Sequence, residues 1–212
     1  GADVVEINAW NHPVPPIVDA DALVVLGGSM SCQDDAEAPW LAPTRQLISR
    51  TVRAGTPFLG ICLGHQLATV ALGGQVCTSD HFCLGAAEMH LTPEGKKDPL
   101  LSVYDGHRGI HFNNDVAVVL PEDAVLLARD PTGQIEAVRF AERAWGVQFH
   151  PECTPEIFDA WTIGHGEKEW QQRLPWSEAV TVAETVRRDI DTVNAEEAFA
   201  ARFQELIDPE KR

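Results

Sequence analysis

The chain has 212 residues, of which 32 are acidic and 16 are basic, so its formal net charge is −16 at pH 7. This length suits one α/β domain with some elaboration and allows a sizeable buried core. The negative charge repels nucleic acid and anionic lipid at long range, so we expect neither nucleic acid nor a membrane as a partner.

The chain contains five cysteines, an odd number without the paired spacing of metal sites. No apolar segment is long enough for a signal peptide or a membrane span, so we expect a reduced, cytoplasmic protein without a bound metal. Cys32 or Cys153 could lie near Cys62 and form an oxidative disulfide with it; the alternative is that both are packing thiols. The remaining two are Cys77 and Cys83.

Apolar runs alternate with helical stretches, which predicts an α/β fold of three layers, with a largely parallel sheet covered by helices on both faces. Helices are expected over residues 41–54 and 64–72, each ending at a glycine. Open parallel sheets bind ligands at the carboxyl ends of their strands, so functional residues should gather there. The strands are expected near residues 3–8, 22–26, 57–61, 75–78, 87–92, 109–112, 117–119, 124–129, 135–140 and 144–149.

An apolar strand over residues 22–26 runs into the paired glycines Gly27 and Gly28. Such a turn can direct bare backbone N–H groups at a bound ligand. The alternative is a tight loop that only ends the strand.

Cys62 lies between Gly60 and Gly64, where a strand gives way to a helix. A strand-to-helix elbow forces a cramped backbone geometry and makes its side chain stand clear of the sheet, as a nucleophile requires. The positive end of the helix dipole favours an anion at this position. The amides of Leu63 and Gly28 could together hold a tetrahedral oxyanion. A buried packing cysteine is the alternative.

The apolar strand over residues 144–149 ends in His150, and Glu152 follows two residues later. Extended residues at this separation share a face, so Glu152 could hold the imidazole in one tautomer. The other ring nitrogen of His150 would then take the proton of Cys62, which completes a nucleophile, a base and an orienting group.

These three segments resemble the class I, or triad, glutamine amidotransferases, especially free-standing proteins similar to the amidotransferase domain of GMP synthase. The resemblance spans about residues 2–155. It rests on the run 26–30 followed by 39–41, on the run 60–66 and on the run 146–152, in the order that the family has.

The resemblance implies a flavodoxin-like fold and a reaction that needs no cofactor. It implies that Cys62 is the nucleophile that attacks the side-chain amide of glutamine, that His150 is the general base and acid, and that Glu152 is its partner. Gln66 would contact the amino acid end of glutamine, and Gly27 would lie at the substrate. The ammonia would pass to an acceptor that the sequence does not identify, and a separate synthetase is a candidate partner.

Two departures from the family pattern are visible. The family begins with a central strand and a helix before the strand matched here by residues 4–7, so we expect an upstream segment to be missing from this sequence. Asn113 and Asn114 stand where many relatives carry a histidine and a glycine, in a segment that lies near the substrate in those relatives. We therefore expect both asparagines at the substrate site, with the identity of the substrate open.

Two other functions remain possible on these grounds. The first is a γ-glutamyl hydrolase or peptidase-like enzyme that uses the same triad on an amide with a larger leaving group. The second is a non-catalytic binding or regulatory module that retains the fold. An intact set of Cys62, His150 and Glu152 argues against the second.

We expect a glutamine amidotransferase-like domain over residues 1–165 and a C-terminal helical extension over residues 166–212 that packs on the same domain. Ser177 is a candidate N-cap, and the extension could alternatively be a lid or a docking surface for the ammonia acceptor. Helical spacing and apolar anchors are expected at Val182, Val186, Ile190, Val193, Phe199, Phe203 and Leu206.

Overall fold

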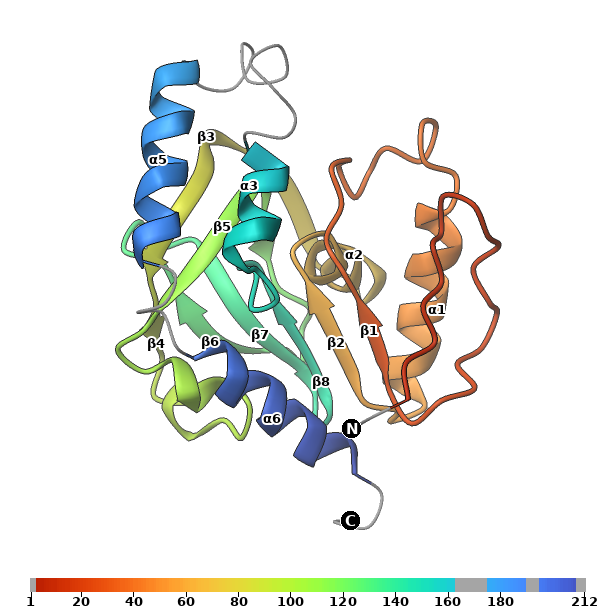
Figure 1. Cartoon of the computed structure of the whole chain (residues 1–212). Coiled ribbons are helices and arrows are strands. Elements are labelled where there is room, and N and C mark those ends of the chain that lie inside the picture. Colours follow the sequence, from red (N-terminus) through yellow and green to blue (C-terminus); the bar gives the residue numbers. More distant parts are fainter. Residues whose placement is uncertain (1–2, 163–174, 190–194, 209–212) are drawn as a thin grey trace.

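The computed structural model describes residues 3–162, 175–189 and 195–208 and confirms the α/β class (Figure 1). A six-stranded sheet has the order β1-β2-β8-β7-β6-β4, and β3 and β5 form a separate two-stranded sheet. The strands are β1 Leu23–Val25, β2 Phe58–Ile61, β3 Gln75–Glu88, β4 His90–Leu91, β5 Arg108–Val119, β6 Val125–Arg129, β7 Ile135–Ala141 and β8 Ala144–Val147. The helices are α1 Leu41–Arg53, α2 Leu63–Ala71, α3 Pro155–Thr162, α5 Trp176–Asp189 and α6 Glu196–Ile207, with 3-10 helices η1 Gly95–Lys97 and η2 Leu101–Tyr104.

Parallel pairing is confined to β1, β2 and β8, the three strands that lead into the motifs. The pairs β8–β7, β7–β6 and β6–β4 are antiparallel. Since parallel strands end at the same edge, the turn after β1, the elbow after β2 and the segment after β8 lie together.

The prediction of a strand over residues 3–8 is wrong. These residues form no strand, and Val4 and Val5 are each 85% exposed. In the described part of the chain β1 is an edge strand that pairs only with β2, so residues 3–8 belong to no ladder. A β-prone run without a partner strand or an apolar layer to cover has nothing to stabilise it as a strand.

The two long antiparallel strands were expected as four shorter ones. β3 continues through residues 79–86, and β5 continues through residues 113–116. Their ladder has a register shift between Thr78 and Cys83, and this irregularity accommodates polar residues that resemble a strand break in the sequence.

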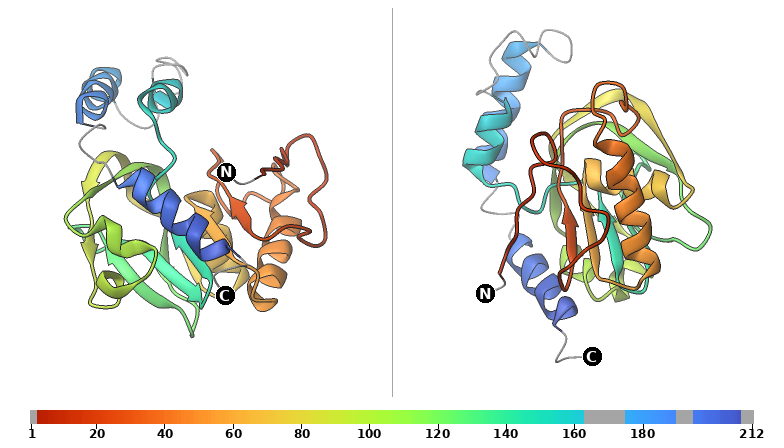
Figure 2. Two further views of the ribbon diagram at one scale, coloured as in Figure 1. Left: turned by 60° about the horizontal axis from the view of Figure 1, so that its bottom comes forward. Right: turned by 90° about the vertical axis from the view of Figure 1, so that its right-hand side faces the viewer.

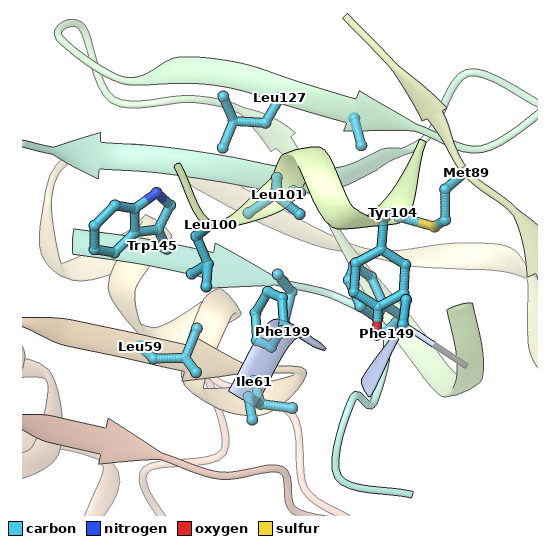
Figure 3. Packing of buried hydrophobic residues seen from close by; sticks show 14 of the residues in the cluster. Leu59, Ile61, Met89, Leu100, Leu101, Tyr104, Leu127, Trp145, Phe149 and Phe199 are labelled. Atoms are coloured by element: carbon cyan, nitrogen blue, oxygen red, sulfur yellow. The ribbon is translucent and has the colours of Figure 1, made fainter. Parts of the chain in front are cut away.

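Helices and 3-10 turns cover both faces of the six-stranded sheet (Figure 2). Side chains of β2 alternate, because Phe58 packs in the cluster with α1 and α2 while Leu59 and Ile61 pack in the cluster on the other face. That second cluster contains η2 and α6, and Figure 3 shows Phe199 of α6 beside Tyr104 and Phe149.

The β3–β5 sheet is covered by α3 and α5, which share a buried cluster with Ile110. Gly85 has a φ of +109°, and a β-carbon there would lie 3.1 Å from the Val182 side chain, so this glycine lets α5 lie against β3.

The prediction that Ser177 is the N-cap is wrong, because α5 begins at Trp176. Ile190 and Val193, which were expected to continue the helical spacing, lie outside the described residues. No helix in the described ranges has the length and apolar character needed to cross a membrane.

Candidate active site

Cys62 occupies the elbow between β2 and α2 with φ +50° and ψ −105°, and no other non-glycine residue in the described part of the chain has a positive φ. Such a conformation costs on the order of 1–3 kcal/mol and persists only where the surroundings enforce it. The Cys62 amide donates to the Val147 carbonyl at 2.8 Å, and the Cys62 carbonyl accepts from the Gln66 amide at 3.0 Å. The elbow is thus bonded to both β8 and α2.

The glycines on either side of Cys62 allow this turn. A β-carbon on Gly60 would lie 2.6 Å from the Gly64 backbone, and one on Gly64 would lie 2.0 Å from the Val25 carbonyl oxygen. Neither position has room for a side chain. The absence of both side chains lets the first turn of α2 lie directly on β1 and β2.

His150 and Glu152 form a hydrogen bond of 2.7 Å between Nδ1 and Oε1. The His150 amide donates to the Ile110 carbonyl at 2.8 Å, which ties the end of this segment to β5. Within the described residues, the buried Nε2 of His150 has no hydrogen-bond partner. The second ring nitrogen is therefore available for a proton transfer.

Cys62 and His150 lie together around Gly27. A β-carbon on Gly27 would come within 2.9 Å of His150 Cε1 and 3.5 Å of Cys62 Cβ. Burial lowers the pKa of His150, but the negative charges of Cys62 and Glu152 outweigh burial and raise it to about 10. The site therefore favours a protonated His150 imidazole at neutral pH.

The turn after β1 also reaches the elbow. A β-carbon on Gly28 would lie 2.8 Å from the Leu63 side chain and 2.9 Å from Met30 Sδ. The two residues expected to supply oxyanion donors are thus neighbours next to Cys62.

Gln66 and Asn113 converge on one backbone carbonyl. Gln66 Nε2 donates to the Asp115 oxygen at 2.9 Å, and Asn113 Nδ2 donates to the same oxygen at 3.2 Å. Asn114 is exposed, and strand alternation directs it to the opposite face of β5 from the buried Asn113. The structure therefore brings Gln66 and Asn113 together and leaves Asn114 apart from them.

Gln148 is a buried polar residue to which the sequence reasoning assigned no role. It is fully buried, and its Oε1 accepts from Gln66 Nε2 at 3.3 Å. Gln148 Nε2 and Asn113 Oδ1 are buried and have no hydrogen-bond partner in the described part of the chain. The available signal was a lone amide side chain inside the apolar run 144–149.

A second buried histidine–carboxylate pair lies beside the first. His111 Nε2 is 2.7 Å from Glu136 Oε2, and His111 Nδ1 is 3.0 Å from the Gly109 carbonyl. Burial lowers the pKa of His111, but the charge of Glu136 and the hydrogen bonds raise it above its ordinary value. The sequence offered no signal for this pair, because its members come from different strands.

All five cysteines are free thiols. Cys62, Cys32 and Cys153 belong to three different buried clusters. Burial raises the pKa of Cys32 to about 11 and that of Cys153 to about 12. The described residues contain no group of three or more histidine, cysteine, aspartate or glutamate side chains that could hold a metal ion.

Comparison with known proteins places this chain in a family. The family model described as glutamine amidotransferase class-I matches residues 3–164. The glutamine amidotransferase-like protein YfeJ of Salmonella typhimurium is 32% identical over 161 residues, which are 74% of this chain and 66% of YfeJ. A subunit of the glutamine-hydrolysing GMP synthase of Halobacterium salinarum is 30% identical over 153 residues, with 71% of this chain and 76% of that subunit covered. The chain spans only 38% of a GMP synthase of Tolumonas auensis, to which it is 29% identical.

Solved structures share the fold of this chain. The crystal structure of SMU.1228c has a TM-score of 0.82 and 25% identity and covers 98% of this chain and 90% of its own. A glutamine amidotransferase of Thermotoga maritima shares the fold with a TM-score of 0.74 at 21% identity, covering 89% of this chain and 78% of its own. With a family model that matches most of its length, the chain belongs to the class I glutamine amidotransferases.

Proposed function

We propose that this protein hydrolyses the side-chain amide of glutamine through a thioester on Cys62 and releases glutamate and ammonia. The observation that carries the proposal is a positive-φ cysteine at a strand-to-helix elbow beside a histidine whose other nitrogen is bonded to a carboxylate. Nucleophile, base and orienting group in this order are the parts that acyl transfer requires.

The proposed reaction has two stages. The Cys62 sulfur attacks the amide carbon, and the N–H groups of Gly28 and Leu63 hold the oxyanion. His150 gives its proton to the nitrogen as the C–N bond breaks, and ammonia leaves. His150 then takes a proton from water, whose oxygen attacks the thioester; glutamate is released and the thiolate returns.

The polar side chains near the elbow suit the amino acid end of glutamine. Gln148 Nε2 is a buried donor that lacks a partner among the described residues, and Asn113 Oδ1 is a buried acceptor that lacks one there. We assign the donor to the α-carboxylate and the acceptor to the α-ammonium group of the substrate. Gln66, bonded to Gln148, would hold this pair in place.

The ammonia would serve a separate acceptor. Three relatives, among them the Halobacterium salinarum protein, are named as a subunit of a glutamine-hydrolysing GMP synthase. By analogy, this chain would supply ammonia to a synthetase that is a different polypeptide.

The test is labelling by diazo-oxo-norleucine, an electrophilic glutamine analogue, followed by peptide mapping with and without free glutamine. Label at Cys62 alone, prevented by glutamine, supports the proposal, and a Cys62→Ala variant should take up no label and release no ammonia. Equal labelling of the other cysteines, or label that glutamine does not prevent, would contradict it.

The second candidate is a γ-glutamyl hydrolase. It is favoured by Asn113, a buried amide at the proposed substrate end in a segment that departs from the family pattern. Turnover of γ-glutamyl dipeptides should be measured beside that of glutamine with the same enzyme. A higher kcat/KM for the dipeptides would favour this candidate.

A further inference from the structure

Trp161 of α3 packs directly against the catalytic candidate His150. The centroids of the two rings are 4.6 Å apart, and their planes are tilted by 59°. Trp161 also meets Phe112 of β5, with ring centroids 5.9 Å apart. The indole therefore contacts both the imidazole and the β3–β5 sheet.

The helix that carries Trp161 is anchored by α5. Phe158 of α3 is buried in one cluster with Ala183 and Val186 of α5. Arg187 of α5 also forms an ion pair with Asp159 of α3, with Nε 3.1 Å from Oδ2. α5 lies beyond the residues that the family model matches, so the placement of α3 depends on a part of the chain outside that match.

Nδ1 of the imidazole is bonded to Glu152 and Nε2 is kept for the proposed proton transfer, so the indole has a role distinct from both. Glu152 bonds Nδ1, and Cys62 acts on the pKa of His150 from the β2–α2 elbow. His111 of β5 is the cation that opposes the protonated ring, and Glu136 of β7 is paired with His111. An indole is the aromatic ring that best stabilises a nearby cation, and it does so without adding a charge.

We propose that Trp161 is a positioning residue that fixes the orientation of the His150 ring and stabilises its protonated form as it donates to the leaving nitrogen. The role in turnover rests on the proposed function, whereas the effect on the imidazole does not. Removing the indole should weaken the protonated state of His150 and free its ring to turn.

The test compares Trp161→Leu with the matched variant Trp161→Phe, which keeps an aromatic ring. In the leucine variant we expect the NMR titration midpoint of His150 to fall by about one pH unit, because the lost cation–π contact favoured the protonated form. We expect kcat with glutamine to fall about tenfold in the same variant, since a misplaced general acid slows the chemistry. KM should stay unchanged, and the phenylalanine variant should keep most of the wild-type midpoint and kcat.

A second measurement needs no turnover. A protonated imidazole quenches a neighbouring indole, so the fluorescence difference between wild type and Trp161→Phe should change with pH as His150 titrates, and this pH dependence should vanish in a His150→Ala background. The exposed Trp10 provides the control, because a Trp10→Phe difference should be the same with and without His150. If Trp161→Leu does not fold, this fluorescence titration decides.

The outcomes separate the two proposals. Wild-type midpoint and kcat in the leucine variant, or a fluorescence difference that ignores His150, would overturn the role of Trp161. A protein without activity on glutamine whose Trp161 fluorescence still follows His150 would leave the positioning role intact and remove the proposed function.

Discussion

Gly27 lies beside the proposed nucleophile Cys62 and the proposed base His150, and an added methyl group would come within 2.9 Å of the His150 ring. In Gly27→Ala the new β-carbon would push the His150 ring away from Cys62. We expect kcat for glutamine to fall about 100-fold, the loss that a misplacement of about 1 Å can cause. Steady-state ammonia release and far-UV circular dichroism would measure activity and folding separately.

Gly73→Ala is the matched control for that substitution. Gly73 has a φ of +102°, and a β-carbon added there would meet no atom within 4 Å, so alanine strains the backbone away from the site. It should lower the free energy of unfolding by about 1 kcal/mol and leave kcat unchanged. Equal activity of Gly27→Ala and wild type would contradict the tight contact with His150.

For single residues, the sequence identified those whose role depends only on their neighbours along the chain. The sequence itself shows that Cys62 lies between two glycines and that Glu152 follows His150 by two residues. Gln148 and Trp161 could not be assigned in this way, because their contacts join segments that only folding brings together.

The helix α6 supplies the element-scale prediction. Phe199 is 2% exposed and belongs to the cluster that contains Cys62 and Phe149. Phe199→Ala would leave a cavity beneath the end of the sheet, so we expect the free energy of unfolding to fall by about 3–5 kcal/mol. Urea unfolding followed by circular dichroism would measure it.

Glu205→Ala, an exposed change on the same helix, is the control and should stay within about 0.5 kcal/mol of wild type. If Phe199→Ala were as stable as this control, α6 would not pack on the sheet as described.

Element boundaries followed the sequence where the apolar pattern was strong. α1 ends at Arg53 and α2 at Ala71, each one residue before the end that its glycine stop predicts. The prediction of a strand over residues 3–8 was wrong because β propensity without a partner strand forms no ladder. The continuous strands β3 and β5 were not predicted because a bulge allows polar residues within one ladder.

The net charge of −16 acts on the molecule as a whole. Self-repulsion destabilises a compact chain, and salt screens it. Raising the ionic strength from about 10 mM to about 150 mM should raise the Tm by about 2–4 °C, the shift that 1 kcal/mol gives in a chain of this size.

The salt effect should shrink as the pH approaches the sequence pI of about 4.7, where the net charge vanishes. Differential scanning calorimetry over this range would test it. A Tm that does not change with salt at neutral pH would mean that opposite charges are paired closely enough to cancel the repulsion.

The sequence by itself determined the α/β class, the order of the three motifs and the chemical character of Cys62, His150 and Glu152, since these depend on local periodicity and on residue type. The tertiary structure alone decided that Asn113 faces Gln66 while Asn114 faces away, that Gln148 leaves a buried donor without a partner among the described residues, and that an indole from α3 packs on the imidazole. The physical reason is that such contacts depend on the packing of strands and helices far apart in the chain, which no local pattern encodes.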